Sequence, residues 1–187
     1  MSDQELLQRF RDPHTSGEGF QLIVRQFQRP IYYYVRRMVL DHDDANDITQ
    51  STFIRAWKGL SGFRGESQLS TWLHTIAYRE ALHFLEQKKR IGKVPADQVA
   101  QRLEAVLAED TLYTGDDIQR RLQVAVATLP PRQKAVFVMK YFEEKKYDEI
   151  AEITGTSVGA LKASYHHAVQ KVEDHLLRYA HQSPQMP

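Results

Sequence analysis

Residues 147–176 read YDEIAEITGTSVGALKASYHHAVQKVEDHL, and this stretch decides the fold class. Apolar residues recur at helical spacing on both sides of Gly155, which predicts a short helix over Tyr147 to Ile153 and a longer helix after a turn. Glycine tolerates the positive φ of a tight turn, and Thr156 or Ser157 can accept a hydrogen bond from a free amide at the start of the second helix. The stretch therefore predicts a helix-turn-helix.

The second of these helices has an apolar face and a polar face. The apolar face, expected to pack on the domain core, comprises Val158, Leu161, Tyr165, Ala168 or Val169, Val172 and Leu176. The polar face comprises Gly159, Ala160, Ala163, His166, His167 and Gln170, with Lys162 on its flank. A polar face of this kind can lie in a major groove of DNA, but a plain helical hairpin would carry the same apolar stripe. The stretch alone leaves both interpretations open.

Composition narrows the class of protein. The chain has 187 residues, 42% of them hydrophobic, which is enough for one packed domain or two small ones. It has no cysteine, which excludes disulfides and thiolate metal sites. No apolar run approaches the roughly 20 residues that span a bilayer, and Met1 to Gly19 is too polar for a signal peptide. We therefore expect a cytoplasmic protein without membrane insertion.

The net charge bears on nucleic-acid binding. It is only +1, whereas a free-standing binder usually carries a clear basic excess. This balance fits a protein whose DNA contacts are weak alone and gain affinity when a larger partner is present.

Helical periodicity dominates the whole chain, and no strand pattern competes with it. We expect an all-α protein of two small helical domains joined by a flexible acidic linker, with the helix-turn-helix in the C-terminal domain. The first domain, the linker, the second domain and a tail are expected over residues 1–91, 92–117, 118–181 and 182–187. A short amphipathic helix over Val99 to Leu107 is an alternative for part of the linker.

In the first domain, Pro30 either divides two helices or bends one. The acidic cluster at Asp41, Asp43 and Asp44 predicts the start of the next helix, because carboxylates are favoured at the positive end of a helix dipole. Along this helix the apolar stripe is Thr49, Thr52, Phe53, Ala56 and Leu60, and the opposite side carries Asp47, Gln50, Ser51, Ile54 and Lys58. Ile54 is then either a stray surface residue or part of a face that binds a partner.

The loop SGFRGESQLS, residues 61–70, precedes a helix expected to begin near Thr71. Its Phe63 and Arg64, close in sequence to Trp72 and Tyr78, are aromatic and cationic groups suited to unstacked bases. The alternative is that Phe63 and Trp72 are core aromatics beneath an ordinary turn.

Taken together, the two domains resemble the bacterial extracytoplasmic-function (ECF) sigma factors, which are promoter-specificity subunits of RNA polymerase. In the first domain the resemblance rests on DITQSTFIRAW, residues 47–57, and on Phe63 followed by TWLHTIA, residues 71–77. In the second it rests on LPPRQKAVFVMKYFE, residues 129–143, preceding YDEIAEITGTSVGALK. These motifs stand in the family's order and cover nearly the whole chain.

The resemblance implies three binding sites. The helix of residues 47–57 would dock on the clamp helices of the polymerase β′ subunit through Asp47, Gln50, Ser51 and Ile54. The 61–70 loop and the next helix would hold the minus-10 element and capture a flipped base with Phe63, Arg64, Trp72, Tyr78 and Arg79. The second domain would touch the β flap and contact the minus-35 element with Lys162, Ala163, His166 and His167. Family precedent adds an anti-sigma factor as a further partner.

Two positions depart from the family pattern. Arg79 stands where members often carry an asparagine that helps hold the flipped base, so a phosphate contact is expected instead. The run ALKASYHHA stands where many members have an arginine-rich sequence. Histidine is largely neutral at pH 7 and cannot reproduce an arginine fork on guanine, so the minus-35 element is expected to be less guanine-directed.

The function expected is therefore a sigma factor that binds core RNA polymerase, recognises the minus-35 and minus-10 elements and helps melt the promoter. The alternative is a stand-alone helix-turn-helix regulator, which the near-neutral charge and the first motif set disfavour. An enzyme is a third class, prompted by eight histidines and 24 acidic residues. No metalloprotease motif, phosphate loop or nucleophile elbow occurs, so no catalytic residue, metal site or cofactor is expected. The remaining histidines, including His74, are expected at the surface or at helix ends.

Overall fold

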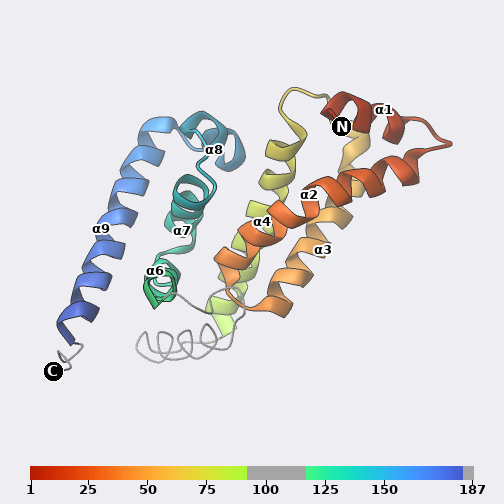
Figure 1. Ribbon diagram of the computed structural model, residues 1–187. Helices are drawn as coiled ribbons and strands as arrows, with labels where there is room; N and C mark the ends of the chain where they lie inside the picture. The colour runs from red at the N-terminus through yellow and green to blue at the C-terminus, as the bar shows by residue number, and fades with distance from the viewer. Residues whose placement is uncertain (92–116, 183–187) are drawn as a thin grey trace. The chain divides into compact units, whose positions relative to one another are not determined.

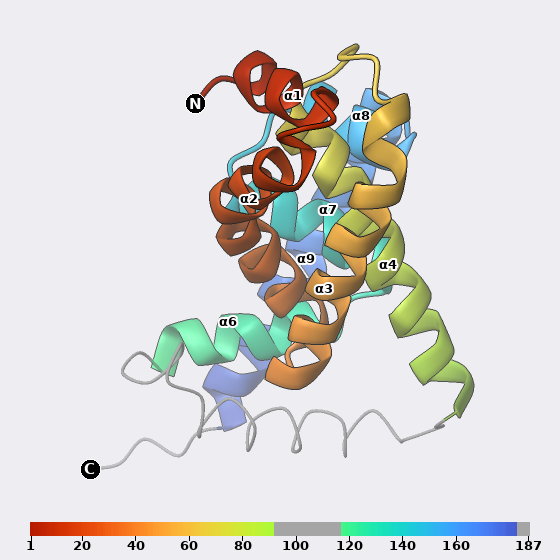
Figure 2. The ribbon, with the colours of Figure 1, turned by 90° about the vertical axis from the view of Figure 1, so that its right-hand side faces the viewer.

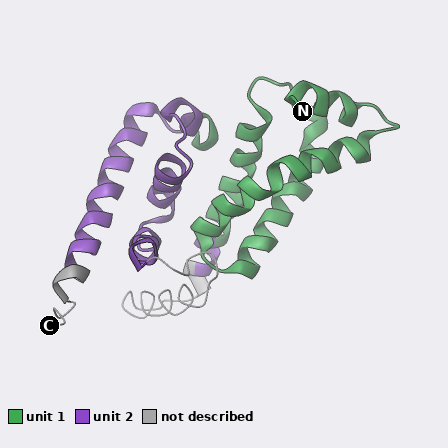
Figure 3. Ribbon diagram, viewed as in Figure 1, with its two compact units in different colours: residues 1–84, 152–155 green, residues 85–151, 156–187 purple. Residues whose placement is uncertain are grey.

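A computed structural model describes residues 1–91 and 117–182 of the chain (Figure 1). Every regular element in these residues is helical, which confirms the all-α prediction. The chain divides into two compact units, residues 1–84 with 152–155 and residues 85–151 with 156–187 (Figure 3). The expected helix over Val99 to Leu107, and almost all of the expected linker and tail, lie outside the described residues.

The N-terminal part contains four α-helices and one 3-10 turn. Their bounds are α1 Asp3–Arg11, α2 Ser16–Val39, α3 His42–Gly59, η1 Leu60–Gly62 and α4 Leu69–Ile91. Helix α2 packs against α1 and α3 (Figure 2). It runs through Pro30 without interruption, so the alternative of two separate helices is wrong.

The start of α3 is as predicted. Asp41 is the residue before the helix, and its carboxylate accepts a hydrogen bond of 2.9 Å from the backbone amide of Asp44. The stripe Thr49, Thr52, Phe53, Ala56 and Leu60 is buried. Polar side chains on the opposite side remain exposed, so α3 presents them outward.

Helix α1 was not predicted, although its sequence carries a local signal. The Ser2 hydroxyl accepts from the Glu5 amide, and the Glu5 carboxylate accepts from the Ser2 amide at 2.8 Å, which together form a capping box. The helix then buries Leu6 and Leu7 against the rest of the unit. A serine followed three residues later by glutamate is the pattern that could have predicted it.

His74 does not lie where it was expected from the sequence. Its side chain is buried with 4% exposure instead of lying at the surface or at a helix end. The ring packs against Tyr34 at a centroid distance of 5.5 Å, and Nδ1 donates to the carbonyl oxygen of Ser70 at 2.9 Å. Because the preceding helical turn satisfies this nitrogen, the imidazole can enter the core without solvent.

The C-terminal part consists of α6 Asp117–Ala127, α7 Pro131–Phe137, a π-helical segment η2 Val138–Phe142, α8 Tyr147–Thr154 and α9 Val158–Gln182. Helix α9 packs against α6 and α7 (Figure 1). Its buried side chains are Leu161, Ala168 and Val172, which belong to the predicted apolar stripe. The helix-turn-helix of residues 147–176 is therefore confirmed as local structure.

Candidate nucleic-acid and protein interfaces

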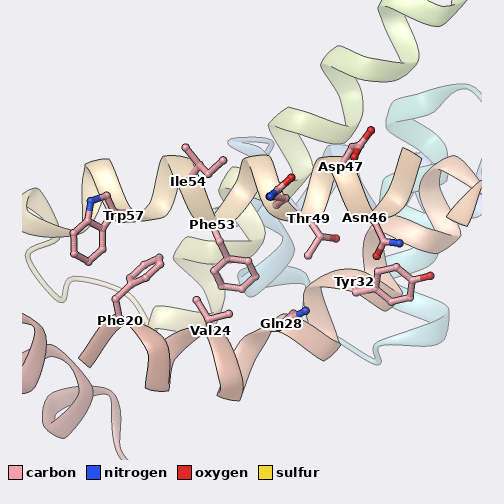
Figure 4. Close-up of a pocket in the computed structure, with 11 residues that line it drawn as sticks. Phe20, Val24, Gln28, Tyr32, Asn46, Asp47, Thr49, Phe53, Ile54 and Trp57 are labelled. Atoms are coloured by element: carbon pink, nitrogen blue, oxygen red, sulfur yellow. The ribbon is translucent and has the colours of Figure 1, made fainter. Parts of the chain in front are cut away.

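A groove of about 660 Å³ runs between α2 and α3, and we call it the α2–α3 groove (Figure 4). Its lining residues are Phe20, Val24, Gln28, Tyr32, Asn46, Asp47, Thr49, Gln50, Phe53, Ile54 and Trp57. Phe53 points from α3 toward Val24 of α2, so the floor is apolar (Figure 4). Polar side chains from both helices complete its sides.

Two large apolar side chains are exposed beside this floor. Ile54 is 50% exposed and Trp57 is 44% exposed. The Trp57 ring is nevertheless held by two edge-to-face contacts, with Phe10 at 5.5 Å and Phe20 at 5.0 Å between centroids. An exposed isoleucine and a fixed, half-exposed tryptophan on the same helix as Asp47 and Gln50 make a mixed surface suited to a reversible protein contact.

The end of the groove far from Trp57 is polar, and His42 connects its side chains. The Tyr32 hydroxyl lies 2.7 Å from His42 Nδ1, and Asn46 Nδ2 lies 3.0 Å from Nε2 of the same ring. Both nitrogens of His42 are thus engaged. The network joins the first turn of α3 to α2 at this end of the groove.

Four residues of α3 were expected to contact the polymerase. Three of them, Asp47, Gln50 and Ile54, line the groove, whereas Ser51 is half-buried outside it. The whole α2 side was missed. Trp57 could have been predicted as part of this surface, because it follows Ile54 by three residues and so lies on the same helical face.

A second, smaller pocket of about 320 Å³ lies at the 61–70 loop. It is lined by Gly62, Phe63, Arg64, Glu66, Ser67 and Trp72. The rings of Phe63 and Trp72 meet at 5.2 Å between centroids with an interplanar angle of 45°. The pocket therefore combines an indole, a guanidinium and hydrogen-bonding groups in one concave site.

The predicted base-contact residues fall into two groups. Phe63, Arg64 and Trp72 come together at this pocket, with Arg64 exposed and Trp72 half-buried. Phe63 is 8% exposed, so it supports Trp72 more than it offers a free ring face. Tyr78 is 6% exposed, and neither it nor the exposed Arg79 lines the pocket.

Two hydrogen bonds from α1 to this loop were not predicted from the sequence. The backbone amide of Leu69 donates to Asp3 Oδ2 at 2.7 Å, and Arg11 Nη2 donates to the carbonyl oxygen of Phe63 at 3.0 Å. The partners are 66 and 52 residues apart, so no local pattern could have linked them.

The turn between α8 and α9 has the predicted chemistry. Gly155 adopts φ +69, in the left-handed region that disfavours residues with a side chain. The Ser157 hydroxyl accepts from the Ala160 amide at 3.3 Å and so caps α9. The four predicted residues of the recognition face, Lys162, Ala163, His166 and His167, are all exposed.

Tyr147 adds a feature at the start of this motif. Lys140 Nζ lies 4.8 Å and Lys162 Nζ lies 5.8 Å from the centroid of its ring. The ring thus gathers two ammonium groups at the beginning of α8. Lys140 was missed because it belongs to the π-helical segment and not to the helix-turn-helix itself.

Two side chains of the C-terminal part have shifted pKa values. Burial lowers the pKa of Lys134 to about 8. Burial, followed by the neighbouring phenols of Tyr147 and Tyr141, raises the pKa of Tyr165.

Among residues 1–91 and 117–182, no group of three or more His, Asp or Glu side chains could hold a metal ion. No helix described there is long and apolar enough to cross a membrane.

Comparisons with known proteins agree with this geometry. Residues 23–91 match the family model of sigma-70 region 2, and residues 119–172 match that of sigma-70 region 4. The chain is 30% identical over 157 residues to the RNA polymerase sigma factor YlaC of Bacillus subtilis, covering 78% of this chain and 85% of YlaC. It is therefore a member of the ECF sigma factors of RNA polymerase. The family to which the chain belongs consists of non-enzymatic transcription initiation factors.

Two further proteins are similar to this chain. The ECF sigma factor SigE of Mycolicibacterium smegmatis is 28% identical over 167 residues, and the match covers 87% of this chain but only 63% of SigE. The sigma factor RpoE of Bartonella quintana, solved in complex with the anti-sigma factor NepR, aligns with a TM-score of 0.63 at 22% identity. That alignment covers 84% of this chain and 96% of RpoE, and it supports the fold.

Proposed function

We propose that this protein is a promoter-specificity subunit that binds core RNA polymerase in the cytoplasm, recognises the minus-35 and minus-10 elements and helps melt the promoter. The observation that carries this proposal is the occurrence of sigma-70 regions 2 and 4 in one chain, in that order. A stand-alone regulator would have no use for region 2. The proposed domain with region 2 spans residues 1–91, and the proposed domain with region 4 spans 118–181.

In this proposal the β′ clamp helices dock on the exposed face of α3, through Asp47, Gln50, Ser51 and Ile54. Trp57 extends the same surface, because its exposed edge lies beside the α2–α3 groove. An interface with exposed apolar side chains among polar ones can bind its partner and still remain exposed in the free protein.

The pocket at the 61–70 loop is proposed to hold a base flipped from the minus-10 element. Trp72 would stack on the base while Arg64 approaches the adjacent phosphate. Phe63 and Tyr78 would act beneath this surface, since both are buried. Arg79 is exposed and is assigned a phosphate contact. Extruding a base costs a few kcal/mol, and a preformed pocket offsets that cost only for a fitting sequence.

The recognition face of α9 is proposed to read the minus-35 element in the major groove, with Lys162, Ala163, His166 and His167 toward the bases. Lys140 and Lys162, held over Tyr147, supply positive charge for the phosphates flanking that groove. The β flap is the second polymerase contact proposed for this part of the chain. An anti-sigma factor is a proposed regulator, since RpoE of B. quintana was solved with one.

The proposal is tested by reconstitution with bacterial core polymerase on genomic fragments and by mapping transcript starts. The double variant Asp47→Ala, Gln50→Ala should weaken core polymerase binding while the unfolding midpoint stays unchanged. Lys58→Ala, an exposed residue of α3 outside the groove, is the control for loss of a surface side chain. Tight, sequence-specific binding of promoter duplex by the isolated protein would instead favour the stand-alone regulator.

A further inference from the structure

Helix α1 lies upstream of the residues that match sigma-70 region 2, yet it makes two long-range hydrogen bonds to the 61–70 loop. The Asp3 carboxylate accepts from Leu69 at one end of the loop, and the Arg11 guanidinium donates to Phe63 at the other. Both hydrogen bonds are partly buried. One helix therefore fixes both ends of the segment that forms the proposed base pocket.

The contact at Leu69 caps the start of α4 from another helix. Leu69 is the first residue of α4, and Gln68, which precedes it, is not a residue that caps helices well. Asp3 instead supplies a carboxylate from another helix, at the end of α4 where the helix dipole favours negative charge. The start of α4, which carries Trp72, is thereby tied to α1.

The contact at Phe63 holds the backbone of an aromatic residue that belongs to the pocket. Arg11 holds the backbone carbonyl of Phe63, whose ring packs on Trp72. A change in this peptide would move the ring that supports the indole. Phe10, the residue before Arg11, packs edge-to-face on Trp57, so the last turn of α1 is itself fixed on α3.

We infer that α1 is a positioning element for the minus-10 pocket, acting through Asp3 and Arg11 without touching the DNA. The part of this inference that concerns promoter binding rests on the proposed function, whereas the part that concerns the loop does not. Removing either contact should loosen the loop and weaken capture of the minus-10 strand. It should leave the polymerase-binding face of α3 intact.

The test uses Asp3→Ala and Arg11→Met in the full chain. Their matched controls are Gln4→Ala and Arg9→Met, which alter exposed residues of the same helix. Amide hydrogen exchange of the free proteins should be about tenfold faster at Leu69 and across the 61–70 loop in the two test variants, the effect of losing one hydrogen bond to a charged group. The two controls should exchange at the wild-type rate. Unchanged exchange at the loop would overturn the inference regardless of any result with polymerase.

The second measurement uses the reconstituted holoenzyme and a single-stranded non-template oligonucleotide from the promoter mapped as above. Both test variants should bind it about 3 to 10 times more weakly while their affinity for core polymerase is unchanged. The slope of log affinity against log salt should stay the same, because a positioning residue neutralises no phosphate.

A salt slope reduced by about one for Arg11→Met would make Arg11 a direct phosphate contact and overturn the inference. A parallel loss of core polymerase affinity would also overturn it, since the damage would then extend beyond the loop. If the wild-type chain forms no holoenzyme, the proposed function fails, and the exchange measurement alone decides whether α1 positions the loop.

Discussion

The close approach of α1 to α2 at Gly19 gives the sharpest prediction for stability. A Cβ built on Gly19 would lie 2.6 Å from the amide nitrogen of Phe10 and 2.8 Å from the carbonyl carbon of Arg9. These are backbone atoms, so the strain of Gly19→Ala cannot be relieved by a rotamer change. The two helices must move apart, or α1 must leave its site.

The magnitude follows from what holds α1 in place. Leu6 is fully buried and Leu7 is 7% exposed, and burial of two leucines contributes about 3 to 6 kcal/mol. If α1 detached completely, the free energy of unfolding would fall by at most this amount. Partial separation, as in an overpacked core, costs about 3 kcal/mol, from which the helix propensity of alanine recovers about 1. Gly19→Ala should therefore lower the free energy of unfolding of this unit by about 2 kcal/mol.

The same helix provides a matched control. Gly17 lies in the first turn of α2 and has no atom within 4 Å of a built Cβ, so Gly17→Ala should leave stability unchanged or raise it by less than about 1 kcal/mol through helix propensity. The chain has two tryptophans, and both, Trp57 and Trp72, belong to the N-terminal unit. Urea unfolding followed by tryptophan fluorescence thus reports this unit separately. If Gly19→Ala proved as stable as Gly17→Ala, the close packing of α1 on α2 would be refuted.

Two further predictions concern the C-terminal part. Glu144 adopts φ 52 after the π-helical segment, so Glu144→Gly should stabilise this part by about 1 kcal/mol, measured as a higher midpoint in thermal unfolding followed by circular dichroism. A lower midpoint would contradict the strain argument. Burial lowers the pKa of Lys134 in the folded protein to about 8, from 10.5 for an exposed lysine. Between these two pH values the folded state therefore binds fewer protons than the unfolded state. Stability should therefore rise between pH 8 and 10.5, by about 3 kcal/mol at most, and Lys134→Met should remove this rise and stabilise the protein at pH 7. Denaturant titrations at several pH values check both effects, and an unchanged pH dependence in the variant would assign the rise to other groups.

The sequence predicted those elements whose cause is local. The turn at Gly155, the cap at Ser157 and the apolar stripe of α9 all depend on residues within a few positions of one another. The start of α3 at Asp41 belongs to the same class. In each case the side chain that stabilises the structure is adjacent to the backbone it stabilises, so spacing alone carries the information.

The features that were not predicted depend on contacts between residues far apart in the sequence. His74 was expected at the surface because histidine is polar, but the carbonyl of Ser70 and the ring of Tyr34 provide a buried environment that composition cannot indicate. The α2 side of the groove was likewise missed. Val24 and Gln28 acquire a role only when α2 lies beside α3, and the sequence does not state that pairing.

The two proposed promoter contacts therefore differ in how they are built. The recognition face of α9 is made by one helix, so its geometry survives as long as that helix forms. The pocket at the 61–70 loop is assembled from η1, the loop and α4, and its two ends are held by α1 from 66 and 52 residues away. A site of this second kind depends on tertiary structure and can be changed by substitutions far from it in sequence. Substitution of Asp3 or Arg11 in α1 should accordingly weaken minus-10 capture, whereas the minus-35 contact should not respond to these two substitutions.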